Sequence, residues 1–95
     1  MQKQSNVSGD YTAFVDNDNL TVYYSPTCSV CIKLADYLDG NNVRYTKKNI
    51  DESAVYETEF NQLNFRVVPL ILTKDNAILG FHKDEVDELL KKYQF

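Results

Sequence analysis

The chain has 95 residues, of which 43% are hydrophobic and 25% are charged, and it carries a formal net charge of -4. A chain of this length predicts one domain with a single core. The negative charge disfavours a nucleic-acid-binding surface, because binding to phosphates requires an excess of basic residues. No run of apolar residues approaches the roughly 18 that span a bilayer. The polar N-terminus lacks the apolar segment of a signal peptide, so we expect a cytoplasmic protein.

Residues 1–19 are expected to form an extension that precedes the main domain. Residues 1–10 are polar and contain Gly9, a composition typical of a disordered tail. Residues 11–15 are predicted as either a short extra strand or a segment that lies on the surface. Residues 16–19 alternate Asp and Asn, which favour turns because their side chains bond to the nearby main chain.

Residues 20–95 predict an α/β domain with elements in the order β-α-β-α-β-β-α, which is a mixed four-stranded sheet flanked by three helices. The first strand covers residues 20–24, which are rich in β-forming residues, and Pro26 ends it. A helix follows, because apolar residues recur at helical spacing. These residues are Cys31, Leu34, Ala35 and Leu38. We expect Gly40 to end this helix in the left-handed conformation.

The second half of the domain continues with strands and helices of similar length. Residues 43–48 predict a half-exposed strand, residues 67–72 a buried strand and residues 77–79 its short partner. Asp51 and Asp84 are expected to cap the second and third helices. The residues expected on the inward faces of these helices are Tyr56, Phe60, Leu63, Val86, Leu89, Leu90 and Tyr93.

The only two cysteines, Cys28 and Cys31, stand where the first strand gives way to the first helix. A sulfur at a helix N-terminus lies beside unpaired main-chain N–H groups and at the positive end of the helix dipole, and both stabilise a thiolate. Cys31 is one turn further along and belongs to the inward stripe. We therefore predict a redox couple. Cys28 attacks a substrate disulfide, and Cys31 then attacks Cys28 and releases the reduced substrate.

Two other uses of these cysteines remain open at this point. Both could simply fill the core, since free cysteine is often buried. A zinc site within one chain would normally need four ligands, and two cysteines with His82 are still one short.

Three segments form a pattern known from other proteins. They are Tyr-Ser-Pro-Thr-Cys-Ser-Val-Cys at residues 24–31, Arg-Val-Val-Pro at residues 66–69 and Leu-Gly-Phe at residues 79–81. In this order they resemble the glutaredoxin family, from Leu20 to the C-terminus. The resemblance implies a thioredoxin-like fold and thiol–disulfide oxidoreductase activity. It also implies a cis peptide bond between Val68 and Pro69, which accounts for a proline at the start of a buried strand.

The resemblance further implies a substrate-binding surface beside Cys28. In the family, the main chain of the residue before the cis-proline pairs with the bound thiol peptide, which assigns Val68 and Pro69 to substrate binding. Arg66 matches a position that is often basic and near a glutathione carboxylate. An exposed Arg66 without a role is the alternative, because surface charges often contribute little.

Two departures from the family pattern bear on the electron donor. Gly80 matches one glycine of the glutathione site, but Phe81 stands where a second glycine is common. In addition, Ser-Val replaces the Pro-Tyr that is frequent between the two cysteines. The Gly-Phe version is more like small redoxins that reduce ribonucleotide reductase, and several similar proteins draw electrons from thioredoxin reductase. We expect Phe81 to form part of an apolar rim around Cys28, with core packing as the alternative, and Tyr24 to join the same surface.

We therefore expect a monomeric dithiol redoxin with no bound cofactor or metal. It would reduce protein or glutathione mixed disulfides, with ribonucleotide reductase as one candidate substrate. The electron donor would be glutathione or thioredoxin reductase. The alternatives are a carrier of an iron–sulfur cluster at a two-chain interface and an inactive binding protein of the same fold.

Overall fold

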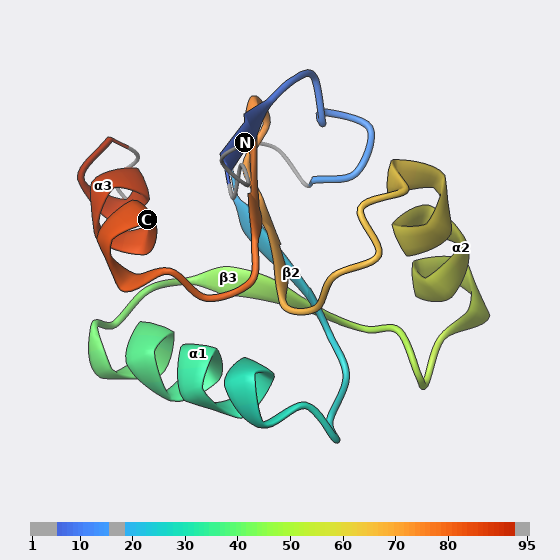
Figure 1. The fold of residues 1–95 in the computed structure, drawn as a ribbon, viewed down its shortest axis with the longest axis horizontal. Helices are drawn as coiled ribbons and strands as arrows, with labels where there is room; N and C mark the ends of the chain where they lie inside the picture. The colour runs from blue at the N-terminus through green and yellow to red at the C-terminus, as the bar shows by residue number, and fades with distance from the viewer. Residues whose placement is uncertain (1–5, 16–18, 93–95) are drawn as a thin grey trace, which may run out of the picture.

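The computed structural model describes residues 6–15 and 19–92, which form a five-stranded sheet with three helices (Figure 1). The elements are β1 (Asn6–Ser8), β2 (Leu20–Tyr24), α1 (Ser29–Gly40), β3 (Tyr45–Asn49), α2 (Ala54–Leu63), β4 (Leu70–Leu72), β5 (Asn76–Leu79) and α3 (Lys83–Lys92). The strand order is β1-β5-β4-β2-β3. Strands β2 and β3 are parallel, and the other neighbours are antiparallel. This confirms the predicted mixed sheet with its three helices.

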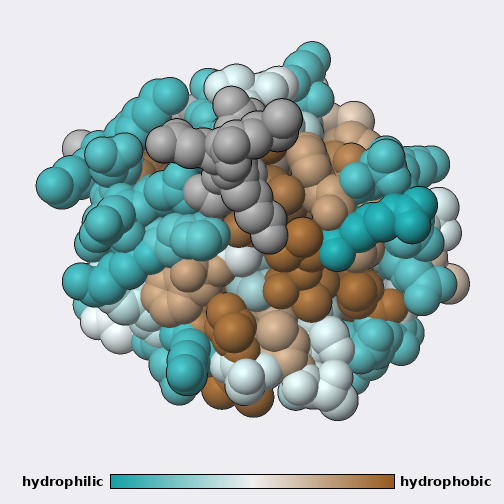
Figure 2. Space-filling model, in the orientation of Figure 1, coloured by the Kyte–Doolittle hydropathy of each residue, from teal (hydrophilic) through white to brown (hydrophobic). Residues whose placement is uncertain are grey.

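The two faces of the sheet carry different apolar clusters. Helices α1 and α3 lie on one side of the sheet in Figure 1, and α2 lies on the other. Strand β2 alternates between them, as successive side chains of a strand must. Leu20 and Val22 pack toward α1 and α3, whereas Tyr23 packs toward α2. In Figure 2, hydrophilic side chains gather over the two outer sides and hydrophobic side chains between them.

The N-terminal extension is part of the sheet and of the core. Strand β1 pairs antiparallel with β5, from Asn6 opposite Ile78 to Ser8 opposite Asn76. Of the two alternatives for residues 11–15, the extra strand is wrong, because these residues form turns. Tyr11 and Val15 are nevertheless each only 7% exposed. The prediction of a disordered tail is therefore wrong for residues 6–10.

This difference has a physical reason. The polar residues of β1 have little intrinsic preference for a strand, so the sequence does not predict one. They form a strand because their main-chain N–H and C=O groups pair with those of β5. Residues 1–5 and most of the predicted turn at 16–19 lie outside the described residues, and the boundary at residue 20 stays a prediction.

The termini of α1 and α2 differ from the sequence-based prediction. Gly40 is still helical, and the left-handed residue after α1 is Asn42, with a φ of 57°. Asn tolerates this conformation because its short side chain bonds to the main chain. Asp51 does not cap α2. Ser53 does, and its side chain accepts a hydrogen bond from the Tyr56 N–H at 3.3 Å.

The remaining elements are close to the predictions. Helix α3 begins at Lys83, so Asp84 lies inside its first turn instead of capping it. There it faces the positive end of the helix dipole. Strand β4 begins only at Leu70, after the proline. Val86 and Leu89 are buried as predicted, and Tyr93 lies outside the described residues. None of the helices in the described ranges has the length and apolar character to cross a membrane.

An ion pair between buried Lys48 and half-buried Glu59 joins the sheet to α2. Lys48 Nζ is 2.8 Å from Glu59 Oε1, and the Lys48 side chain is only 9% exposed. Tyr23 donates a second hydrogen bond to the same carboxylate at 2.7 Å. Burial raises the pKa of Glu59, but the hydrogen bonds from Lys48 and Tyr23 outweigh it and hold the pKa below its ordinary value. The carboxylate therefore compensates the lysine charge inside the fold.

This pair predicts a loss of stability in acid. Because the folded pKa of Glu59 is depressed, its contribution is present above the ordinary value of 4.5 and is lost as the pH falls through the folded pKa. Glu59→Gln should lower the free energy of unfolding at pH 7 by about 1–3 kcal/mol. The variant should also lose part of the acid dependence in urea unfolding. Glu57→Gln, at an exposed site on the same helix, is the matched control. Equal acid dependence in Glu59→Gln and wild type would contradict this prediction.

Candidate active site at the cysteine pair

The Cys28 sulfur caps the N-terminus of α1. Cys28 has extended backbone angles, and its Sγ accepts a hydrogen bond from the Cys31 main-chain N–H at 3.3 Å. Serine, threonine, aspartate or asparagine usually fills this position, and the side chain bonds to the second or third helical residue. In this chain the Cys28 sulfur takes that position, beside the free N–H groups at the positive end of the helix dipole. The predicted position of Cys28 at the helix opening is confirmed.

The Cys31 sulfur lies in a different environment. Cys31 is 5% exposed, whereas Cys28 is half-buried. Burial raises the pKa of Cys31 to about 12, and a hydrogen bond and charge interaction with Cys28 act in the same direction. A main-chain hydrogen bond with Ser25 opposes this shift only in part. Cys31 is therefore a protonated thiol at neutral pH, and the two sulfurs have the unequal exposure that the sequence predicted.

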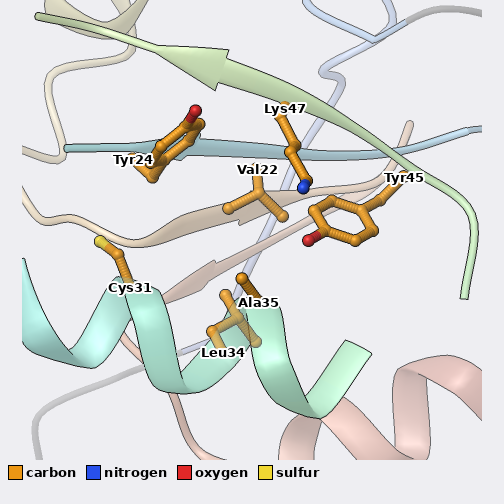
Figure 3. A pocket seen from close by; sticks show the side chains of 7 residues that line it. All are labelled: Val22, Tyr24, Cys31, Leu34, Ala35, Tyr45 and Lys47. Atoms are coloured by element: carbon orange, nitrogen blue, oxygen red, sulfur yellow. The ribbon is translucent and has the colours of Figure 1, made fainter. Parts of the chain in front are cut away.

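A small cavity adjoins Cys31 between α1 and the neighbouring strands (Figure 3). Its volume is about 80 Å³. It is lined by Val22 and Tyr24 of β2, Cys31, Leu34 and Ala35 of α1, and Tyr45 and Lys47 of β3. Figure 3 shows the Cys31 sulfur directed from the helix toward the Tyr24 ring. The mostly apolar lining explains why the charged form of Cys31 is disfavoured, and it places Tyr24 beside the cysteine pair.

The loop before β4 faces Cys28. The peptide bond between Val68 and Pro69 is cis, as the resemblance implied. The Cys28 thiol donates a long hydrogen bond, 3.9 Å, to the main-chain oxygen of Val68. Gly80, with a φ of 87°, donates its N–H to the Pro69 oxygen at 2.9 Å. The fold therefore brings Val68 beside the Cys28 sulfur and ties Gly80 to the neighbouring Pro69, and the binding roles of these three residues stay predictions.

Arg66 and Phe81 are less closely tied to Cys28. Arg66 is exposed and left-handed, with a φ of 60°, and its Nε donates to Asn64 Oδ1 at 3.2 Å. The Phe81 ring lies 5.5 Å from the Tyr37 ring and packs against the cluster beneath α1 and α3. This contact fits the core-packing alternative, and a place for Phe81 in a rim around Cys28 stays a prediction.

Sequence reasoning missed the residues that hold the turn before Cys28. Ser25 donates a hydrogen bond to Asp51 Oδ2 at 2.6 Å, and its hydroxyl lies 3.1 Å from that of Thr27. The Cys28 N–H bonds to the Ser25 oxygen at 3.1 Å and closes the turn. Asp51 thus ties the loop after β3 to the turn that carries the sulfur. No local signal predicts this pair, because the two residues are 26 positions apart.

The described ranges contain no cluster of three or more His, Cys, Asp or Glu residues that could hold a metal ion. The two sulfurs are free cysteines. Their arrangement at a helix opening is suited to exchange between dithiol and disulfide forms.

A Cys-x-x-Cys pair at a helix N-terminus, opposite a cis-proline in a mixed sheet, defines a redoxin of the thioredoxin-like fold. Residues 20–78 match the glutaredoxin family. The chain therefore belongs to that family of thiol–disulfide oxidoreductases.

Relatives with curated descriptions agree with this membership. An uncharacterized glutaredoxin-like 8.6 kDa protein in the rubredoxin operon of Clostridium pasteurianum is 32% identical over 74 residues, which cover 77% of this chain and 99% of that protein. The glutaredoxin-like protein NrdH of Lactococcus lactis subsp. cremoris is 29% identical over 70 residues, covering 74% of this chain and 97% of that protein.

Solved structures confirm the fold. The crystal structure of glutaredoxin from Archaeoglobus fulgidus matches with a TM-score of 0.71 at 19% identity, over 87% of this chain and 97% of that one. The thioredoxin-like protein BC3987 matches with a TM-score of 0.69 at 22% identity, over 76% of this chain and 100% of that one.

The unequal sulfurs predict unequal alkylation. With a pKa of about 12 against an ordinary value of 9.0, Cys31 should react with iodoacetamide at least about tenfold more slowly at pH 8 than an ordinary exposed thiol, after allowance for the higher nucleophilicity of its thiolate. Its rate should rise steadily with pH, as long as the protein stays folded. Mass spectrometry of each cysteine peptide against time measures both rates.

Cys28→Ala is the informative companion variant for this measurement. It removes two interactions that raise the Cys31 pKa, so the alkaline rise should begin at a lower pH. Equal labelling of both cysteines at pH 8 in folded wild-type protein would show that the assigned asymmetry is wrong.

Proposed function

We propose that this protein reduces disulfides by a dithiol mechanism in which Cys28 is the nucleophile and Cys31 the resolving thiol. The observation that carries the proposal is the position of Cys28 Sγ, which accepts the Cys31 N–H at 3.3 Å and lies 3.9 Å from the Val68 oxygen. One side of the sulfur thus has a donor that stabilises negative charge. The other side has main-chain groups that can align a peptide substrate.

In the first step, the Cys28 thiolate attacks one sulfur of the substrate disulfide. A bond forms between Cys28 and that sulfur, the substrate S–S bond breaks, and the second substrate sulfur leaves as a thiolate that takes up a proton. A substrate extended along Val68 could pair with its main chain, as strands do at an exposed edge. Half-buried Cys28 is the accessible sulfur for this attack, whereas Cys31 is nearly covered.

In the second step, Cys31 loses its proton and attacks Cys28 Sγ. The Cys28–Cys31 disulfide forms, the mixed disulfide breaks, and the reduced substrate is released. Formation of the mixed disulfide removes the negative charge and the hydrogen bond of Cys28, both of which raise the Cys31 pKa. Cys31 therefore becomes easier to deprotonate when its attack is needed. The two cysteines carry both electrons, so the exchange requires no bound cofactor.

We propose a disulfide-containing protein as the substrate, with ribonucleotide reductase as the first to test. The Gly80-Phe81 pair and the similarity to the NrdH proteins of Lactococcus lactis support this choice. Thioredoxin reductase is the proposed electron donor and glutathione the alternative. The proposed setting is the cytoplasm, where closely spaced cysteines more often serve redox chemistry than structural cross-links.

The dithiol mechanism predicts different effects for the two serine variants. Cys28→Ser should abolish reduction of a protein disulfide, because the attacking sulfur is gone. Cys31→Ser should still attack but accumulate as a mixed disulfide with the substrate. Non-reducing electrophoresis and intact mass measure the trapped adduct. An adduct formed by Cys28→Ser instead would reverse the assigned roles.

The electron donor can be tested with the oxidised protein. Reduction is followed through NADPH consumption with thioredoxin reductase and, in parallel, with glutathione and glutathione reductase. We expect efficient turnover with thioredoxin reductase, because Phe81 replaces a glycine of the glutathione site. Efficient turnover with glutathione alone would contradict this interpretation of Phe81. Turnover with neither donor would overturn both donor assignments.

A further inference from the structure

We propose that the N-terminal segment, residues 6–15, positions the substrate-binding loop, residues 64–69, through contact between Tyr11 and Phe65. The inference rests on the proposed function, because it concerns how that loop receives a peptide disulfide. Tyr11 would be a positioning residue that never touches the substrate. The family match covers residues 20–78, so the N-terminal segment lies outside the matched region and the loop that it contacts lies inside it.

The N-terminal segment is fastened along its length. Strand β1 pairs with β5 through three residue pairs. The Tyr11 N–H donates to the Lys74 oxygen at 2.9 Å, and the Gly9 N–H donates to the Asp75 oxygen at 3.1 Å. Further along, buried Lys48 donates to the Phe14 oxygen at 3.0 Å. The main chain on both sides of Tyr11 is therefore fixed to the sheet.

Tyr11 itself is held in one orientation. Its side chain is 7% exposed, and its hydroxyl donates to the Val7 oxygen at 3.1 Å. The ring passes close over Gly9, where an added Cβ would lie 2.9 Å from the Tyr11 hydroxyl oxygen. Its ring lies 6.1 Å from the Phe65 ring at 61°, an edge-on contact of the kind that aromatic pairs favour.

The loop that receives this contact needs support. Asn64 and Arg66, on either side of Phe65, are both left-handed, with φ values of 61° and 60°. Asn64 is the C-cap of α2 and tolerates this conformation, whereas for Arg66 it costs roughly 1–2 kcal/mol and persists where the surroundings hold it. Phe65 is half-buried in the cluster that contains Tyr11, and Arg66 is exposed. The aromatic contact therefore anchors the centre of the strained turn.

The same cluster reaches the reacting sulfur. Val68 packs against the apolar cluster that contains Tyr11, and the Val68 oxygen lies 3.9 Å from Cys28 Sγ. A change in the turn at Phe65 should therefore move the main chain that aligns a peptide substrate. It should leave the sulfur and its helix cap intact, because these belong to α1.

Two disulfide substrates separate positioning from chemistry. One is a short peptide with an internal disulfide, which can pair with the Val68 main chain. The other is bis(2-hydroxyethyl) disulfide, which has no peptide main chain. Stopped-flow oxidation of the reduced protein over a range of substrate concentrations gives the limiting rate and the half-saturation concentration for each.

Tyr11→Ala should lower the second-order rate constant for the peptide about tenfold, mainly through the half-saturation concentration, and leave the small disulfide within about twofold. Tyr11→Phe keeps the ring contact with Phe65 and loses only the hydroxyl bond to Val7, so it should lose much less than Tyr11→Ala. Leu89→Ala removes a buried side chain from the opposite cluster and controls for lost stability. It should leave the ratio of the two rate constants unchanged.

Phe65→Ala tests the same contact from the loop and covers the case in which Tyr11→Ala does not fold. It should show the same selective loss, and the double variant should lose no more than either single variant. Equal slowing of both substrates, or no slowing of the peptide reaction in Phe65→Ala, would overturn the positioning role. Wild-type protein that reduces neither disulfide would overturn the proposed function together with the inference.

Discussion

The hydrogen bond from the Cys31 N–H to Cys28 Sγ is the contact on which the site depends. It makes the reactive sulfur part of the helix terminus, because the sulfur satisfies a main-chain donor that a serine or aspartate would otherwise satisfy. The turn closed by Ser25 and tied to Asp51 delivers Cys28 to this position. The cap and the proposed nucleophile are therefore one atom, so the geometry that starts α1 also fixes where the proposed exchange would take place.

The burial that protects Cys31 has a thermodynamic consequence. The folded chain keeps the Cys31 proton up to about pH 12, whereas the unfolded chain releases it near the ordinary value of 9.0. The unfolded state therefore binds fewer protons in this window, and stability contributed by the thiol declines as the pH rises. Tyr45, on the wall of the same cavity, adds to this effect, because burial raises its pKa to about 12 as well. Cys31 and Tyr45 are therefore both protonated and uncharged near neutral pH.

Sequence reasoning found the features encoded within short segments. The cysteine spacing, the β-forming residues at 20–24 and the cis bond before Pro69 all carry a local or family pattern. Sequence reasoning failed where the structure depends on contacts between residues far apart in the chain. Strand β1 exists because the edge of β5, about seventy residues away, offers main-chain partners. Asp51 was the expected cap of the second helix, and only the fold shows that Ser53 caps it while Asp51 is engaged by Ser25.

The N-terminal segment packs beside α2 on the same face of the sheet, so it contributes to the stability of the apolar cluster there. Tyr11 and Val15 bury apolar surface, and Phe14 accepts a hydrogen bond from the ion-paired Lys48. These contacts stabilise the same cluster that supports Val68 beside the nucleophile. A small domain has few layers between its core and its surface. The packing that holds the fold together therefore also sets the distance between Cys28 and the loop that we propose aligns its substrate.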